Sequence, residues 1–140
     1  MKILGLDPGS KRIGVALSDE LRLMAHGMDS IQRGRVEKDL ERIRMIVWEN
    51  DVSEIVVGLP VSMNGSHSAQ TKEVLKFIDD LAAAVKVPVR TWDERLTSVQ
   101  AERILLEADM SRAKRRKFRD KVAAKVILQS YLDSLKRREI

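Results

Sequence analysis

Two apolar runs near the N-terminus, residues 2–7 and 13–18, are separated by a segment of only a few residues that begins with Pro8 and Gly9. Two parallel strands need a connection of about a dozen residues or more, whereas antiparallel strands can be joined by a tight turn. Proline followed by glycine is typical of such a turn. We therefore expect the chain to begin with an antiparallel hairpin, which starts the sheet that later strands join.

The remaining sequence alternates between strand-like and helical patterns. Val36, Leu40, Ile43 and Val47 recur at the spacing of one helix face, and this helix is expected to stop near residues 50–51. The other predicted elements, in chain order, are a weakly patterned strand at 21–31, a strand at 54–59, a polar loop at 61–68, a helix around 74–85, a strand at 87–92, a helix at 98–108, a basic stretch at 112–119 and a last helix at 118–135.

This order of elements predicts an α/β fold. The expected sheet is mixed and five-stranded, with an antiparallel hairpin start followed by parallel strands, and helices flank it. A chain of 140 residues fits one domain with a real hydrophobic core. We therefore expect residues 1–140 to form a single domain.

Composition restricts the location and the partners of the protein. The chain has no cysteine, which excludes disulfides and thiolate metal sites and favours the reducing cytoplasm. No stretch approaches the roughly 18 apolar residues of a membrane helix, so no membrane partner is expected.

Residues 112–140 contain eleven Lys/Arg and three Asp/Glu, a net charge of +8, while residues 1–111 carry −3. A polyanion is the simplest partner for so basic a segment, although a solvated surface would also explain it.

Two acidic residues follow predicted strands. Asp7 ends the first apolar run, and Glu94, next to Asp93, follows the strand at 87–92. Ligands of such sheets bind beyond the carboxyl ends of the parallel strands. Each acid also has an ordinary interpretation: Asp7 forms a turn before proline and glycine, and Glu94 precedes a helix whose dipole favours acids.

A third acid belongs to the last predicted helix. Asp120 precedes Ala124, Ile127 and Tyr131 by four, seven and eleven residues, so it shares a helix face with three apolar residues. A carboxylate on a buried face is unfavourable unless something compensates it. A metal ion would compensate it, and so would a base from the neighbouring Lys/Arg cluster.

Together these acids have a specific chemical use. If the fold brings Asp7, Glu94 and Asp120 together, they form a hard, oxygen-rich site suited to Mg²⁺ or Mn²⁺. Two such ions about 3.5–4 Å apart can activate water and stabilise the leaving oxygen of a phosphodiester. With the basic segment holding a nucleic-acid backbone, the combination predicts a metal-dependent nuclease.

Other residue types carry less information. His26 and His67 lack metal-ligand spacing and are interpreted as structural or surface residues. No phosphate-binding glycine motif is present. Trp48 and Trp92 are interpreted as core residues rather than as platforms for nucleic-acid bases.

Four ordered motifs resemble the YqgF family, which is also called RuvX. They are GLDPGSKRIGVA at residues 5–16, VGLPVSMNGS at 57–66, DERLTS at 93–98 and DKVAAKVILQ at 120–129. The resemblance spans nearly the whole chain and implies the fold of RNase H-like nucleases. It also implies that Asp7, Glu94 and Asp120 are the catalytic acids and metal ligands, with Asp93 as an alternative or a fourth ligand.

The resemblance also implies a function. The family is described as Holliday junction resolvases and, in bacteria, as nucleases that mature the 5′ end of pre-16S ribosomal RNA. We therefore expect a hydrolase of phosphodiester bonds that acts in ribosome biogenesis, with cleavage of four-way DNA as the alternative. Precursor rRNA, branched DNA and the ribosome or its precursors are the expected partners, and a monomer or a homodimer fits. The expected nucleic-acid contacts are Lys11, Arg12, Arg95, Lys114, Arg115 and Arg116.

Two other classes of function stay open. The turn at residues 7–10 resembles the phosphate loop of actin-like nucleotide-binding modules, but those proteins clamp the nucleotide between two domains and this chain is too short for both. A non-catalytic RNA-binding factor for ribosome assembly would also be basic. Intact acids at all three positions argue against it.

Overall fold

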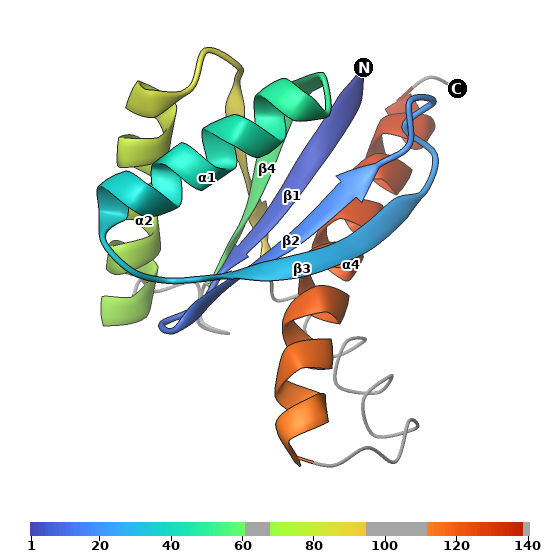
Figure 1. Ribbon diagram of the computed structural model, residues 1–140. Helices are drawn as coiled ribbons and strands as arrows, with labels where there is room; N and C mark the ends of the chain where they lie inside the picture. Colours follow the sequence, from blue (N-terminus) through green and yellow to red (C-terminus); the bar gives the residue numbers. More distant parts are fainter. Residues whose placement is uncertain (61–67, 95–111, 139–140) are drawn as a thin grey trace.

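The computed structural model describes residues 1–60, 68–94 and 112–138, and within the last of these segments it describes the side chains of residues 122–136. The strands form one sheet in the order β3-β2-β1-β4-β5 (Figure 1). The pairs β1–β2 and β2–β3 are antiparallel, and the pairs β1–β4 and β4–β5 are parallel. This confirms the expected five-stranded mixed sheet with a hairpin start. The strands are β1 (Lys2–Pro8), β2 (Arg12–Ser18), β3 (Ala25–Gln32), β4 (Val52–Leu59) and β5 (Val89–Asp93).

Helices cover both faces of the sheet. Helices α1 (Val36–Glu49) and α2 (Ala69–Ala84) lie on one face, and α4 (Arg112–Arg138) lies on the other (Figure 1). Among the described helices, none has the length and apolar character that crossing a bilayer requires.

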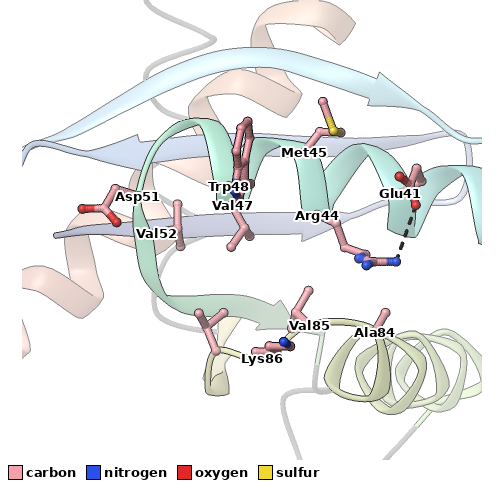
Figure 2. Close-up of a pocket in the computed structure, with 11 residues that line it drawn as sticks. Glu41, Arg44, Met45, Val47, Trp48, Asp51, Val52, Ala84, Val85 and Lys86 are labelled. Atoms are coloured by element: carbon pink, nitrogen blue, oxygen red, sulfur yellow. Dashed lines mark ion pairs between the residues drawn. The ribbon is translucent and has the colours of Figure 1, made fainter.

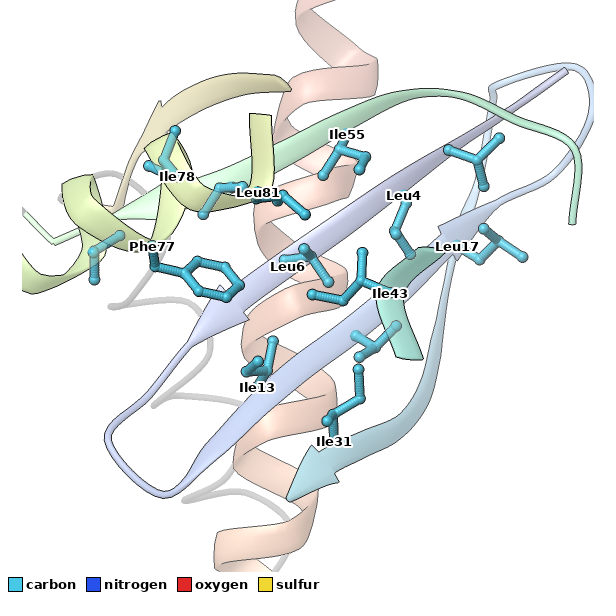
Figure 3. Close-up of a cluster of buried hydrophobic side chains, with 14 residues drawn as sticks. Leu4, Leu6, Ile13, Leu17, Ile31, Ile43, Ile55, Phe77, Ile78 and Leu81 are labelled. Carbon is cyan, nitrogen blue, oxygen red and sulfur yellow. The ribbon is translucent and has the colours of Figure 1, made fainter. Parts of the chain in front are cut away.

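Alternating side chains of β1 enter two separate cores. Leu4 and Leu6 are fully buried in the core beneath α1 and α2 (Figure 3). Ile3 is buried in the core beneath α4. Because successive strand residues point to opposite faces, Asp7 belongs to the same face as Ile3, which is the α4 face.

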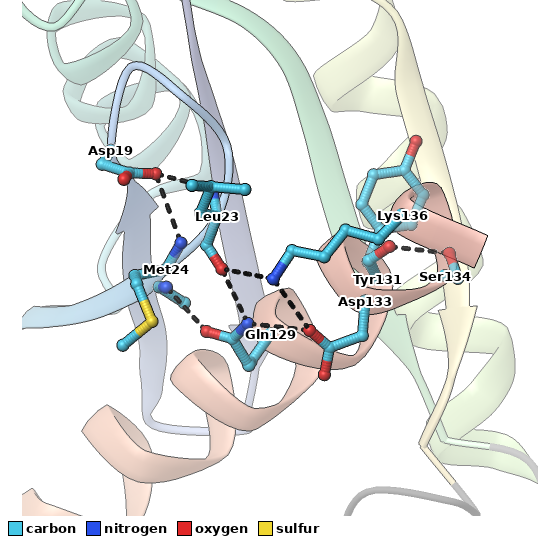
Figure 4. A network of polar contacts seen from close by, with 9 residues as sticks. Asp19, Leu23, Met24, Gln129, Tyr131, Asp133, Ser134 and Lys136 are labelled. Atoms are coloured by element: carbon cyan, nitrogen blue, oxygen red, sulfur yellow. Dashed lines mark hydrogen bonds and ion pairs between the residues drawn. The ribbon is translucent and has the colours of Figure 1, made fainter. Parts of the chain in front are cut away.

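The C-terminal half of α4 is hydrogen-bonded to the connection between β2 and β3 (Figure 4). The Gln129 side chain accepts from the Ala25 amide at 2.8 Å and donates to the Leu23 carbonyl at 3.0 Å. Lys136 donates to the same carbonyl at 3.4 Å. This connection lies at the end of the sheet where β1 begins. The C-terminal half of α4 is therefore at that end, and the helix begins toward the opposite end, where β1, β4 and β5 finish.

A second set of contacts joins α4 to the edge strand β5. The indole Nε1 of Trp92 donates to the Ser130 hydroxyl at 3.1 Å. The Trp92 ring also meets the Tyr131 ring edge-on, with centroids 5.6 Å apart and an interplanar angle of 80°. The Tyr131 hydroxyl donates to the Glu54 carboxylate of β4. These contacts fix the helix against the strands that it crosses.

Several boundaries differ from those expected. Strand β3 begins at Ala25 rather than residue 21, because Asp19 accepts hydrogen bonds from the amides of Leu23 and Met24 and holds residues 19–24 as a loop. Helix α4 begins at Arg112, so the basic stretch is helical, as the good helix propensity of Ala, Lys and Arg allows. The expected helix at 98–108 lies outside the described residues.

Candidate active site

Asp7 and Glu94 lie at the ends of the two strands that flank β4. Asp7 is the penultimate residue of β1, and Glu94 follows directly after β5. Strand β4 lies between them, with Leu6 opposite Val57 and Trp92 opposite Gly58. Trp92 packs beneath α4, so alternation along the strand places Glu94 on that face as well. Both acids therefore project from the α4 side of the sheet, across the width of one strand.

The two carboxyl groups are hydrogen-bonded to each other. Burial, the hydrogen bond to Asp7 and the charges of Asp7 and Asp93 raise the pKa of Glu94 to about 9. Burial also raises the pKa of Asp7, against the opposing effect of the hydrogen bond from Glu94. Two carboxyls in contact share a proton because they cannot both be ionised at low cost. Of the two adjacent acids that the sequence left open, Glu94 is the partner of Asp7.

Gly58 of β4 makes room for this pair. A β-carbon at this position would lie 2.6 Å from Oε1 of Glu94 and 2.5 Å from Cδ1 of Ile127 on α4. Both distances are shorter than van der Waals contact. The Glu94 carboxyl and the helix can therefore approach β4 only because residue 58 has no side chain.

Gly5 has the same effect on β1. A β-carbon there would lie 2.8 Å from the Cβ atom of Leu128 and 3.4 Å from the Ala124 carbonyl oxygen. Asp120 precedes Ala124 by one helical turn, about 6 Å, and Asp7 follows Gly5 by two strand residues, about 6.6 Å, in the same direction. The backbones of Asp120 and Asp7 therefore lie at a similar level of the molecule.

The helix face predicted to carry Asp120 is buried. Ala124, Ile127 and Tyr131 all belong to the core beneath α4, so the expected apolar row is confirmed. The side chain of Asp120 lies outside the described side chains, and its place beside the other two acids stays a prediction. Among the side chains that the structure describes, no group of three or more His, Asp or Glu residues gathers in one place. Asp120 lies outside that set.

The structure describes some of the predicted nucleic-acid contacts and not others. Lys11 is exposed on the turn between β1 and β2, and Arg12 is half-buried at the start of β2, both close in sequence to Asp7. The residues Lys114, Arg115 and Arg116 lie in the first turns of α4, and their side chains are outside the described set. Arg95 lies outside the described residues.

A cavity of about 510 Å³ lies far from these acids, between the end of α1 and the loop before β5 (Figure 2). Neither Asp7 nor Glu94 lines it. Trp48 stands at its edge with 82% of its surface exposed, so its interpretation as a core residue is wrong. It lies one position beyond the apolar row of α1, on the solvent side. Trp92, which packs on Tyr131, agrees with its core interpretation.

Gly5 and Gly58 are the residues around the acids that sequence reasoning did not identify. Both lie within apolar strands beside large residues, where glycine is otherwise unfavourable. A glycine inside a strand often marks the close approach of another backbone, and that signal could have found both.

Comparison with known families and proteins identifies relatives over nearly the whole chain. A family model described as "RuvX: Holliday junction resolvase" matches residues 1–134. A protein of Desulforamulus reducens named "Putative pre-16S rRNA nuclease" is 51% identical over 134 residues, 96% of this chain and 98% of that protein. A protein of the same name from Thermoanaerobacter pseudethanolicus is 50% identical over 139 residues, 99% of this chain and all of that protein.

Solved structures confirm the expected RNase H-like fold. The chain is similar to T. thermophilus RuvC in complex with a Holliday junction substrate, with a TM-score of 0.61, 18% identity and coverage of 98% of this chain and 96% of that one. It is also similar to the fowlpox virus resolvase in complex with Holliday junction DNA, with a TM-score of 0.58, 12% identity and coverage of 96% and 99%. At such identities the likeness is one of fold.

Proposed function

Because the chain belongs to the RuvX family, we propose that Asp7, Glu94 and Asp120 form the active centre of a metal-dependent nuclease that matures the 5′ end of pre-16S rRNA. The chain is an α/β protein with an RNase H-like fold. Its relatives over nearly the whole length carry the name of a nuclease for pre-16S rRNA. We take residues 1–140 as one nuclease domain.

The observation that carries the proposal is the hydrogen-bonded pair of Asp7 and Glu94. Burying two carboxyls in contact is unfavourable unless a proton or a cation compensates them. Strands β1, β4 and β5, together with Gly58, nevertheless bring the two carboxyls into contact beneath α4. A structural role alone gives no reason for that arrangement, whereas binding a cation does.

The donor set fits a hard divalent cation. Asp7 and Glu94 offer only oxygen atoms, which Mg²⁺ and Mn²⁺ prefer. Asp120 is the proposed third ligand, from the α4 face where its helix row is buried. We propose two ions, Mg²⁺ or Mn²⁺, held among these acids. When bound, such ions lower the pKa of an attacking water and stabilise the leaving oxygen of the phosphodiester.

The chain's own residues have two tasks in this proposal. The acids must lose their shared proton to bind the cation, because only the ionised carboxylates are good ligands. Lys11 and Arg12 on the adjacent turn, Arg95, and Lys114, Arg115 and Arg116 at the start of α4 hold phosphates of the substrate. Phosphate contacts position a nucleic acid without reading its sequence.

Precursor rRNA is the proposed substrate, and four-way DNA is the second candidate. The relatives that are about half identical to this chain are named for pre-16S rRNA, which favours RNA. The description of the family model favours the DNA junction. We propose that the protein works in the cytoplasm, on the ribosomal precursor, as a monomer or a homodimer.

One experiment tests both the chemistry and the substrate. The protein is incubated with pre-16S RNA and with a four-way DNA junction, side by side, with Mg²⁺, Mn²⁺, Ca²⁺ or excess chelator. We expect cleavage of the RNA 5′ region with Mg²⁺ or Mn²⁺, little cleavage with Ca²⁺ because its looser coordination positions water poorly, and none in chelator. Full activity in chelator would contradict the metal site, and cleavage of the junction alone would select the second candidate.

A further inference from the structure

The turn that follows Asp7 is held from outside by Arg33, which comes just after β3. Nη1 of Arg33 donates a hydrogen bond to the Gly9 carbonyl oxygen at 2.6 Å. The backbone amide of Arg33 donates to the Lys11 carbonyl oxygen at 2.9 Å. One residue therefore binds the turn at two points, on either side of Ser10.

The guanidinium of Arg33 is itself held in place. Its central carbon lies 5.3 Å from the centre of the Phe77 ring, and Phe77 is buried in the core beneath α2. A cation over an aromatic face is attracted to it, and the planar guanidinium stacks well there. Helix α2 is in turn tied to the end of β4, because Thr71 donates a hydrogen bond to the Pro60 carbonyl.

A backbone hydrogen bond closes the turn itself and leaves no space for a side chain on Gly9. The Gly9 amide donates to the Arg12 carbonyl at 2.8 Å. A β-carbon on Gly9 would lie 2.9 Å from that same oxygen. Any side chain at residue 9 must therefore displace the bond that closes the turn.

We propose that Arg33 is a positioning residue for the nuclease reaction: by fixing the turn between Asp7 and Arg12, it fixes the position of a phosphate bound at Lys11 relative to the Asp7 carboxylate. This inference rests on the proposed nuclease function. Arg33 acts through the turn, since its Nη1 is bonded to Gly9, whereas Lys11 is exposed and able to meet a phosphate. Small misplacements of reacting groups cost about 100-fold in rate.

The test compares Arg33→Ala with Arg35→Ala. Arg35 is exposed and its side chain makes no cap hydrogen bond to α1, so its replacement removes the same charge close by. In Arg33→Ala we expect hydrogen exchange of the Gly9 amide to speed up in metal-free protein, and kcat on pre-16S RNA to fall roughly 10- to 100-fold with KM changed less than about threefold. Arg35→Ala should change neither.

Two further variants separate positioning from direct contact. Gly9→Ala disturbs the turn from within and should give the same exchange and kcat changes as Arg33→Ala. Lys11→Ala should flatten the salt dependence of RNA binding by about 0.7 in log K against log salt concentration, while Arg33→Ala leaves it unchanged. An unchanged Gly9 exchange rate in Arg33→Ala, or a flattened salt dependence in that variant, would overturn the proposal. If the wild type cleaves neither substrate, the proposed function fails, and the exchange measurement still decides whether Arg33 holds the turn.

Discussion

Asp7 and Glu94 hydrogen-bond through their carboxyl groups although β4 separates β1, which carries Asp7, from β5, which Glu94 follows. Such a bond requires a proton on one of the two oxygens. The metal-free site is therefore a proton-binding site over a wide range of pH, and a cation and a proton compete for the same two carboxyls.

Stability of the metal-free protein should fall as pH rises. Burial is the main cause that raises the pKa of Glu94 from 4.5 to about 9. Between these values the folded state holds a proton that the unfolded chain has lost, so the stabilisation present below about pH 4.5 is lost as pH approaches about 9. One such proton changes the free energy of unfolding by at most about 1.4 kcal/mol per pH unit. Chemical denaturation from pH 5 to 9 measures this slope.

The matched control for that slope is Glu94→Gln, which cannot ionise and should show a flatter dependence on pH. Glu49→Gln, an exposed acid on α1, should keep the wild-type slope. Excess Mg²⁺ should weaken the fall, since ion binding favours the ionised pair. Equal slopes in the wild type and Glu94→Gln would show that the pair does not titrate as described.

Neutralising any one of the three acids should abolish cleavage. Asp7→Asn, Glu94→Gln and Asp120→Asn keep the side-chain shape and remove the charge that holds the cation. RNA binding should persist or tighten, because negative charge near the phosphate is removed, and double variants should lose little more than single ones. Cleavage and filter-binding assays on the same preparations measure both effects.

For Asp120 a thermal melt adds an independent readout. If Asp120 faces the other acids, Asp120→Asn leaves the metal-free protein as stable as the wild type or slightly more so. If Asp120 is half of a buried salt bridge, the variant loses about 3–5 kcal/mol. A large loss of melting temperature with cleavage retained would remove Asp120 from the site.

Gly58→Ala should reduce both stability and cleavage. The added methyl group meets Cδ1 of Ile127 and Oε1 of Glu94, and overpacking of this kind costs about 1–3 kcal/mol. The control is Gly34→Ala, where the structure places no atom within 4 Å of the new carbon. Melting temperature and cleavage rate are measured for both.

A second substitution separates the two clashes of Gly58→Ala. Ile127→Val removes Cδ1, so the double variant should recover part of the lost stability. The contact with Glu94 remains, so cleavage should stay low. Recovery of cleavage together with stability would mean that the Glu94 contact has no effect on the reaction.

The basic start of α4 should control the salt dependence of RNA binding. Replacing Lys114, Arg115 and Arg116 with alanine should weaken binding for all sequences alike and flatten its salt dependence, by about 0.7 per lost phosphate contact on single strands. Stability should change by no more than about 0.5 kcal/mol. The triple variant Lys38→Ala, Arg42→Ala and Arg44→Ala removes equal charge from exposed positions of α1 and should bind as the wild type does. The same slope in both triple variants would place the binding surface elsewhere.

Much of the arrangement around Asp7 could be predicted from the sequence. The short connection after Asp7 predicted a hairpin, and the following alternation predicted parallel strands, which placed two acids at strand ends but left open whether they meet. The choice between Asp93 and Glu94 could not be made, because it depends on which face the last residues of β5 present. The contact of Trp92 with α4 reveals that face in the folded structure.

Other features depend on contacts that a linear pattern does not contain. Trp48 looked like a core residue because aromatic side chains usually are, yet the rotation of α1 leaves it in solvent. Arg33 belongs to none of the sequence motifs, and its proposed role follows from its distances to Gly9 and Phe77. The start of β3 could not be predicted because the side chain of Asp19 holds the preceding loop.

Because Gly5 and Gly58 have no side chains, they affect which substitutions a protein with this fold can tolerate. Neither glycine can transfer a proton, hold an ion or touch a phosphate through a side chain, yet each sets how closely α4 lies to its strand. In a saturation screen scored for cleavage, these two positions should tolerate as few substitutions as the acids. A search restricted to chemically reactive residue types would overlook the spacing on which the acids depend.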